Sequence, residues 1–162
     1  MTTINGALLR DPTGAFIPSL GYRVLKTENI NTPTGVDLFT VTGKIHLTLW
    51  TVEVTNALGA LVLDYKIRIK TDNVDLCAAT NLGGAVVGWH GGLDNIPGSD
   101  MIQGIGITLP RFTDLDAGHR VLGNAGGSLT LESLRTAGDS GDELKHTVYY
   151  WPMEAGAVMV PA

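Results

Sequence analysis

Apolar and polar residues alternate between Lys44 and Thr71, and this alternation predicts two long strands. The second half places mostly charged residues between apolar ones at 61, 63, 65, 67 and 69. A period of two is typical of a strand with one buried face. A short turn at Asn56-Ala57-Leu58-Gly59 separates the two halves, so we predict a hairpin around which the rest of the chain is organised.

The first half of this stretch, Lys44 to Thr55, changes phase. Its apolar residues occupy odd positions up to Leu49 and even positions from Trp50 onward. Because successive side chains of a strand point to opposite faces, the change predicts a β-bulge near Leu49, or burial on both faces.

Other strands are predicted at 21–27, 36–42, 74–79, 102–109, 128–134, 143–151 and 157–160, and loops at 90–98 and 120–127. No segment sustains the 3.6-residue period of a helix, and about eight or nine short strands separated by turns predict an all-β sandwich or barrel. We expect a single-domain, jelly-roll-like β-sandwich over residues 19–162, although the pattern alone does not separate jelly-roll from immunoglobulin-like topology. Residues 1–18, interrupted by Pro and Gly, are predicted to form an extended N-terminal arm.

Length and composition narrow the function classes. A chain of 162 residues fits one domain that buries roughly 70% of its unfolded surface. Cys77 is the only cysteine, which excludes an intrachain disulfide and a cysteine-based zinc site, and we predict that it is a core residue. The net charge is −5 without a basic stripe, which argues against a nucleic-acid partner.

Charged residues make up only 17% of the chain, below the roughly 25% of ordinary soluble proteins. This low share favours either a surface buried against other subunits or a β-protein whose polar residues are mostly neutral. No apolar run reaches the ~18 residues of a membrane span, so we expect no membrane partner. The first residues lack the pattern of a signal peptide, so we expect synthesis in the cytoplasm.

One short motif suggests catalysis. Gly138-Asp139-Ser140-Gly141 resembles the nucleophile loop of chymotrypsin-like serine proteases, whose partners would come from His46, His90, Asp64, Asp94 and Asp100. Only 22 residues follow Ser140, however, and Asp142 stands where that family has a second glycine. We therefore expect an acidic turn here, no catalytic residue and no enzyme activity.

Metal and cofactor signals are equally weak. His90, Asp94 and Asp100 share one loop but lack zinc or calcium spacing, whereas Asp114 and Asp116 have the spacing of a calcium pair but no third ligand, which is more typical of a solvated turn. The glycine pairs 83–84 and 91–92 lack the lysine and helix of a phosphate loop. We expect no metal and no cofactor.

The three tryptophans, Trp50, Trp89 and Trp151, lie in or beside predicted strands. Packing in the core or an interface is the ordinary role of such residues. A sugar-stacking platform at Trp89 with the loop His90 to Gly98 is the alternative.

Two stretches, Gly43-Lys44-Ile45-His46-Leu47-Thr48-Leu49-Trp50 and His146-Thr147-Val148-Tyr149-Tyr150-Trp151-Pro152-Met153-Glu154-Ala155-Gly156-Ala157, carry a resemblance to a known family. In this neutral, glycine-rich β-chain they resemble the capsid decoration (cement) proteins of tailed bacteriophages. The resemblance implies a β-sandwich or jelly roll, often a homotrimer, that docks on the outer surface of the capsid by binding the major capsid protein. Another virion component, such as a tail or head-completion protein, or a carbohydrate-binding module, is the alternative.

The charged face of the second predicted strand, with Asp64, Lys66, Arg68 and Lys70, contrasts with the acidic second half of the chain. We expect this face to be solvent-exposed or docked on an acidic neighbour. In the docked case, charge reversal at Lys66 and Arg68 should weaken assembly without unfolding the monomer.

Overall fold

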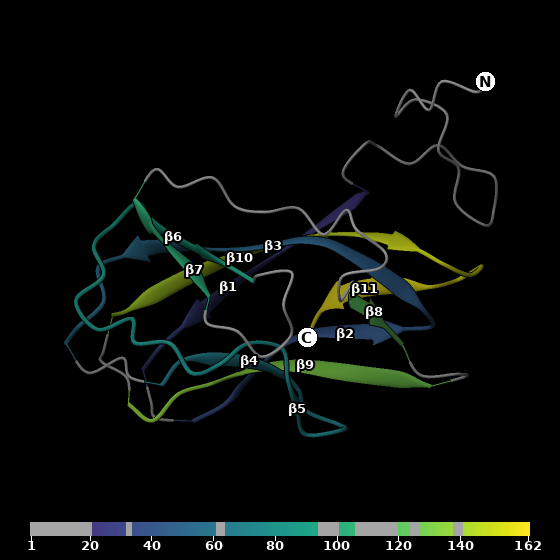
Figure 1. The fold of residues 1–162 in the computed structure, drawn as a ribbon, viewed down its shortest axis with the longest axis horizontal. Coiled ribbons are helices and arrows are strands. Elements are labelled where there is room, and N and C mark those ends of the chain that lie inside the picture. Colours follow the sequence, from purple (N-terminus) through teal and green to yellow (C-terminus); the bar gives the residue numbers. More distant parts are fainter. Residues whose placement is uncertain are drawn as a thin grey trace.

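The computed structural model (Figure 1) describes residues 21–31, 34–60, 64–93, 101–105, 120–123, 127–137 and 141–162. These residues form eleven strands and no helix: β1 (Tyr22–Asn29), β2 (Val36–Thr42), β3 (Ile45–Asn56), β4 (Lys66–Ile69), β5 (Val74–Asp75), β6 (Trp89–Gly92), β7 (Ile102–Ile105), β8 (Arg120–Leu122), β9 (Ser128–Leu134), β10 (Glu143–Pro152) and β11 (Val158–Pro161). The all-β prediction is confirmed. The predicted arm, residues 1–18, lies outside the described residues.

The strands form two antiparallel sheets that face each other as a β-sandwich (Figure 1). The first sheet has the order β1-β10-β3-β6-β7, with β8 also pairing with β3, and the second has the order β11-β2-β9-β4-β5. Strand pairs nest along the chain: β4 pairs with β5, β3 with β6, β2 with β9 and β1 with β10. The first half of the chain therefore pairs with the second half in reverse order, and these pairs are divided between the two sheets.

The predicted hairpin between Lys44 and Thr71 is wrong. β3 belongs to the first sheet and β4 to the second, so the turn after Asn56 crosses between layers. Both edges of β3 are already occupied, one by β10 and the other by β6 and β8, which leaves no edge for β4. The chain reverses instead at Lys70–Asn73, where Asn73 has φ +55° and its N–H donates to the Lys70 carbonyl.

The phase change in β3 does mark a bulge. Opposite β10, Tyr149 pairs with Leu49 but Tyr150 pairs with Leu47, so Thr48 is the extra residue. The predicted burial on both faces is also present, because Ile45, His46, Leu47 and Thr48 are all buried. One extra residue thus lets β3 send apolar side chains into the core along its whole length.

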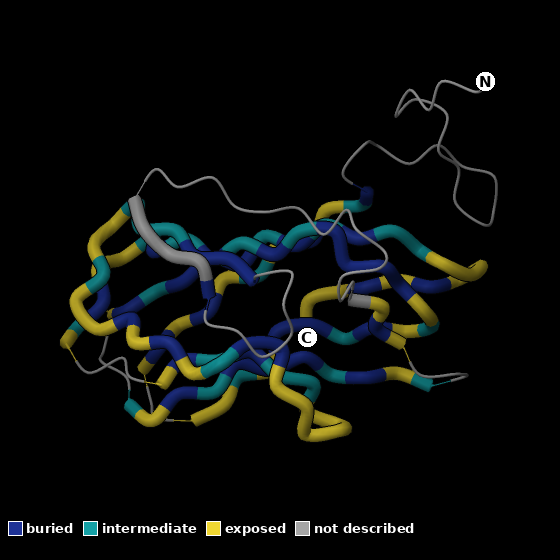
Figure 2. Tube along the Cα trace, viewed as in Figure 1, coloured by how far each residue is buried: buried dark blue, intermediate teal, exposed yellow. Residues whose placement is uncertain are grey.

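The core fills the space between the sheets, and Figure 2 shows buried residues along both layers with exposed ones mainly in the turns. Trp50 on β3 meets Phe39 on β2 edge to face, with ring centroids 5.4 Å apart. The predicted inner face of β4 is confirmed at Tyr65 and Ile67, which are fully buried. Cys77 is buried as predicted, and its Sγ accepts the Ile67 N–H at 3.3 Å.

Two predicted loops contain strands. Residues 89–92 form β6 and residues 120–122 form β8, and both pair with β3. Neither segment has the alternation of a half-buried strand, since β6 contains two glycines and β8 has three residues. They become strands because they pair with the edge of β3 that β10 leaves unpaired, and the local sequence pattern does not predict this pairing.

Candidate functional site

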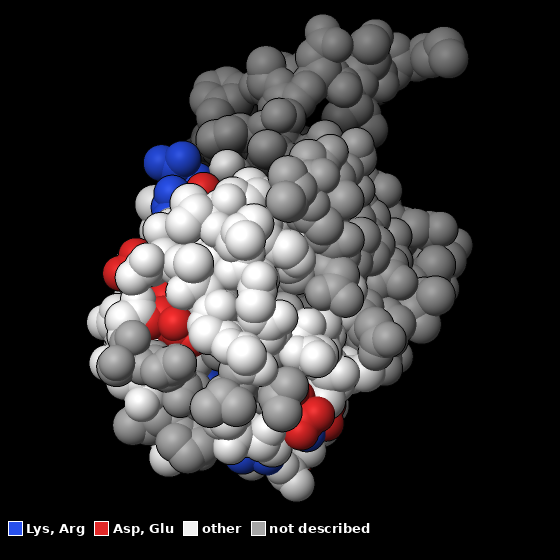
Figure 3. Space-filling model, turned by 90° about the vertical axis from the view of Figure 1, so that its left-hand side faces the viewer, with Lys and Arg blue, Asp and Glu red and all other residues white. Residues whose placement is uncertain are grey.

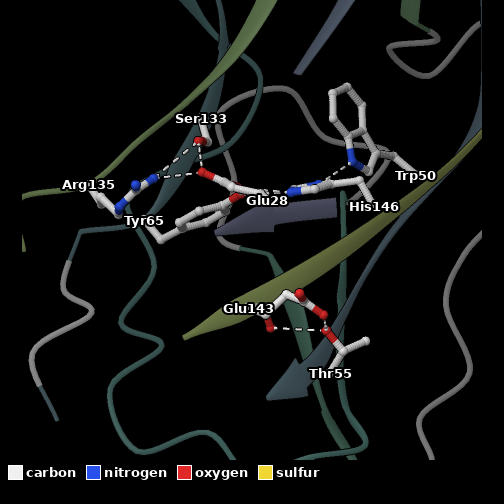
Figure 4. Close-up of polar contacts among 8 residues, drawn as sticks. All are labelled: Glu28, Trp50, Thr55, Tyr65, Ser133, Arg135, Glu143 and His146. Atoms are coloured by element: carbon white, nitrogen blue, oxygen red, sulfur yellow. Dashed lines mark hydrogen bonds and ion pairs between the residues drawn. The ribbon is translucent and has the colours of Figure 1, made fainter. Parts of the chain in front are cut away.

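Polar side chains from both sheets meet inside the sandwich (Figure 4). Glu28 on β1 is the centre of this polar cluster, which also contains Trp50, Tyr65, Ser133, Arg135 and His146. The Glu28 carboxylate accepts hydrogen bonds from the Tyr65 hydroxyl at 2.8 Å, from Arg135 at 2.6 Å, and from the Ser133 hydroxyl. The cluster therefore links β1 and β10 of one sheet to β9 and the start of β4 in the other.

The hydrogen bonds define the tautomer of His146. The indole Nε1 of Trp50, which is only a donor, lies 3.2 Å from Nδ1 of His146. Nδ1 therefore accepts this hydrogen bond, and the ring carries a proton on Nε2. That proton points at Oε2 of Glu28, 3.0 Å away, and the Tyr65 oxygen lies 3.2 Å from the same nitrogen.

Burial and hydrogen bonding oppose each other at Glu28. Burial raises the pKa of its carboxyl, but the hydrogen bond and the electrostatic attraction of His146, together with hydrogen bonds from Ser133 and Tyr65, outweigh burial and hold the pKa below its usual value of 4.5. The pKa of Tyr65 is raised well above 10.0, first by burial and then by the neighbouring Glu28 charge. Glu28 is thus a carboxylate matched by the Arg135 guanidinium, while Tyr65 stays neutral.

The cluster is sealed from solvent. The side chains of Glu28, Arg135 and His146 are 0% exposed. A carboxylate beside an imidazole is a combination that enzymes use for proton transfer, but a reactant must reach it. In the folded chain these groups hold the two sheets together.

Sequence reasoning missed Glu28 and Arg135 entirely. A signal was present, because Glu28 follows Tyr22, Val24 and Lys26 on the inward-facing positions of β1, and His146 alternates with polar residues in phase with Leu144 and Val148 on β10. A charged residue at an inward-facing position of a strand is expected to have a buried partner, because an unpaired buried charge is costly. Which residue supplies that partner is not encoded locally, since Arg135 lies 107 positions from Glu28.

Of the predicted protease residues, the structure describes His46, His90 and Asp64, and each has a different environment. His46 is buried in β3 with its ring 5.8 Å from that of Trp151, and His90 lies in β6 with Nδ1 2.8 Å from the Gly88 carbonyl. Asp64 is exposed and accepts a hydrogen bond from Thr136. Asp94, Asp100, Asp139 and Ser140 lie outside the described residues.

Asp142 has a structural role instead. Its buried carboxylate accepts the backbone N–H of Gly59 at 3.0 Å and so holds the crossing turn between β3 and β4. Beside it, the Thr55 hydroxyl donates to the Glu143 carboxylate at 2.6 Å, which ties β3 to β10 (Figure 4).

No cluster of metal-ligating side chains occurs among the described residues. Of the candidate metal ligands, His90 is described, but Asp94, Asp100, Asp114 and Asp116 are not. The part of the chain that the structure describes also holds no helix long and apolar enough to cross a membrane.

Trp50 and Trp89 both pack against the core, but to different depths. Trp50 is fully buried. Trp89 packs partly buried against the core, and its ring lies over Gly91, where an added Cβ would approach within 2.5 Å. One part of the ring that a sugar would stack on is therefore covered by its own strand.

The charged face of β4 meets acids of its own chain. Lys66 pairs with Asp75 at 2.7 Å, Lys70 pairs with Asp37 at 2.8 Å, and Arg68 pairs with Glu132. These acids come from the neighbouring strands of the same sheet and from β2. Each basic residue of this face thus has an intramolecular partner, which removes the charge excess that predicted an acidic docking partner.

One long side of the sandwich presents apolar side chains at two open strand edges. Among the described residues β1 pairs only with β10 and β11 only with β2, so these strands form the edges of their sheets. Leu25 on β1 is 40% exposed, and Val158 and Val160 on β11 are 39% and 45% exposed. The two edges lie together, because Lys26 donates to the Ala162 carbonyl.

No protein-family model, curated protein or solved structure matches this chain. The interpretation of its function therefore depends on the residues and their geometry.

Proposed function

We propose that this chain is a structural protein of a tailed-bacteriophage virion, a decoration protein that binds the outer surface of the capsid as an oligomer and stabilises it. The open side formed by β1 and β11 is the observation that carries the proposal. An edge strand offers unpaired N–H and C=O groups to another chain, and exposed apolar side chains beside it add contact area. The major capsid protein is the proposed partner, and a trimer the proposed assembly.

The strand order supports a jelly-roll interpretation of the sandwich. A jelly roll is a doubled ribbon wrapped into two sheets, with its strand pairs nested along the chain. The pairs β1 with β10, β2 with β9, β3 with β6 and β4 with β5 follow that scheme. This topology agrees with the resemblance to decoration proteins.

Charge and burial fit a passive binding role. The fully buried ion pair of Glu28 and Arg135 is sealed from solvent, and the basic residues Lys66, Arg68 and Lys70 are paired with acids of the same chain. Repetition of a modest contact over a symmetric shell gives strong overall attachment through avidity. Little affinity is then needed from any one copy.

Co-sedimentation tests the proposal directly. The purified chain is mixed with expanded capsids, lacking this chain, of the phage that encodes it. We expect saturable binding, and we expect V158D/V160D to reduce the bound fraction at limiting protein at least about tenfold, because charges at both exposed valines must be desolvated.

Val74→Asp is the matched control, because Val74 is 48% exposed on β5 at the opposite edge of the same sheet. It should bind like the wild type. A chain that ignores capsids contradicts the proposal, and a chain that instead assembles into rings or tubes on its own favours a tail or head-completion part.

A further inference from the structure

We infer that the turn formed by residues 82–88, at one end of the sandwich, is the surface through which copies of this chain contact one another. This inference deepens the proposed function and rests on it, since a decoration protein that acts as an oligomer needs such a surface. The turn is distinct from the β1 and β11 side proposed to meet the capsid.

Two consecutive tight turns build this surface. The Ala85 N–H donates to the Leu82 carbonyl at 3.1 Å with Gly84 at φ +75°, and the Trp89 N–H donates to the Val86 carbonyl at 3.0 Å with Gly88 at φ +84°. Both glycines occupy the position where a type II turn requires a positive φ. The backbone path is therefore specified by the sequence.

The turns are anchored to the end of β3 and the segment that follows it. The Leu58 N–H donates to the Ala85 carbonyl at 2.9 Å, Gly84 N–H to the Gly59 carbonyl at 3.0 Å, and Gly88 N–H to the Val54 carbonyl at 3.0 Å. Residues held in this way lose little further entropy on binding. The surface is preorganised.

The tip is apolar and exposed. Val86 and Val87 are 52% and 61% exposed, and Val87 is the most exposed of the large apolar residues in the described part of the chain. Residues 76–93 contain no Lys, Arg, Asp or Glu. Figure 3 views this end of the molecule, where most of the described surface is uncharged and the Lys, Arg, Asp and Glu atoms form a few separate groups.

The lack of charge favours a second copy as the occupant. Around a rotation axis, each residue near the axis meets its own counterpart, so a charged residue there faces a like charge. The chain has a net charge of −5, and most of its surface would repel a copy of itself at close range. The uncharged turn is a place where copies meet without that repulsion, and interfaces between identical subunits are the more apolar kind.

Sedimentation velocity over a range of concentrations tests the inference. We expect the wild type to assemble and V86D/V87D to raise the dissociation constant at least about tenfold, with an unchanged far-UV circular dichroism spectrum. V158D/V160D is the matched control, since it makes the same two replacements at exposed valines of β11. It should assemble like the wild type.

The two proposals fail separately. A wild type that is monomeric at every concentration, or V86D/V87D that assembles normally, overturns the inference and leaves capsid binding intact. Dissociation by V158D/V160D alone also overturns it and moves the interface to β11. If V86D/V87D loses capsid binding while the wild type is a monomer, the turn contacts the shell instead, which again overturns it.

Discussion

Two groups of ion pairs stabilise this sandwich in different ways. The polar cluster around Glu28 lies between the sheets with its ion-paired side chains 0% exposed. The basic face of β4 lies on the outside, where Lys66 and Asp75 are 28% and 42% exposed. Water screens the Lys66–Asp75 and Lys70–Asp37 pairs, so each is worth little, whereas a buried charge that loses its partner has no solvent to replace it. The same chemistry is thus indispensable in one place and dispensable in the other.

The largest effect is expected from R135M. It removes the cation that faces Glu28 and leaves a buried carboxylate, which should lower the free energy of unfolding by about 3–5 kcal/mol. Urea titration followed by tryptophan fluorescence measures the change. The double variant E28Q/R135M removes both charges and should lose less than R135M alone. A loss below about 1 kcal/mol for R135M would mean that the cluster is not sealed.

The pH dependence of stability is the next expected effect. Because the pKa of Glu28 is lowered in the folded state, its contribution is present above its ordinary value of 4.5 and is lost as pH falls below it. His146, Tyr65 and Arg135 face this carboxylate from the packed elements, and the pKa of Tyr65, raised above 10.0, adds a loss of stability as pH rises past that value.

Thermal unfolding between acidic and alkaline pH separates these two contributions. E28Q should show a shallower loss of stability in acid than the wild type, and Y65F a shallower loss in alkali. Parallel curves for wild type and E28Q would contradict the assigned ionisation of Glu28.

Y65F at neutral pH should have a smaller effect than R135M. It removes the hydroxyl that donates to Glu28 at 2.8 Å, while Arg135 and Ser133 still donate to the same carboxylate. We expect a loss of about 1–3 kcal/mol by chemical denaturation. A loss as large as that of R135M would show that the hydroxyl, not the guanidinium, governs the cluster.

The smallest effect is expected at the outer face. K66A should change the free energy of unfolding by less than about 1 kcal/mol, and the change should shrink further in 1 M salt, where the Debye length is about 3 Å. R68E is a different case, because Glu132 is buried and would face a like charge, so it should destabilise the monomer. Charge reversal at Arg68 is therefore not the neutral probe of assembly that the sequence predicted.

The sequence alone determined where most strands lie and which residues face inward. The strands predicted at 36–42, 128–134 and 143–151 match β2, β9 and β10, and Leu144, His146 and Val148 alternate on the buried face of β10. Alternation is a local property, since neighbouring side chains of any strand point to opposite faces. The bulge in β3 was also predicted, from the change of phase of the apolar positions near Leu49.

Only the tertiary structure decided which strands pair and which polar groups meet. β3 does not pair with β4, because β10, β6 and β8 occupy its edges. His146 reaches Glu28 across 118 positions of sequence. The free edge of a strand and the partner of a buried charge both depend on segments far along the chain, and a pattern of neighbours carries no information about them.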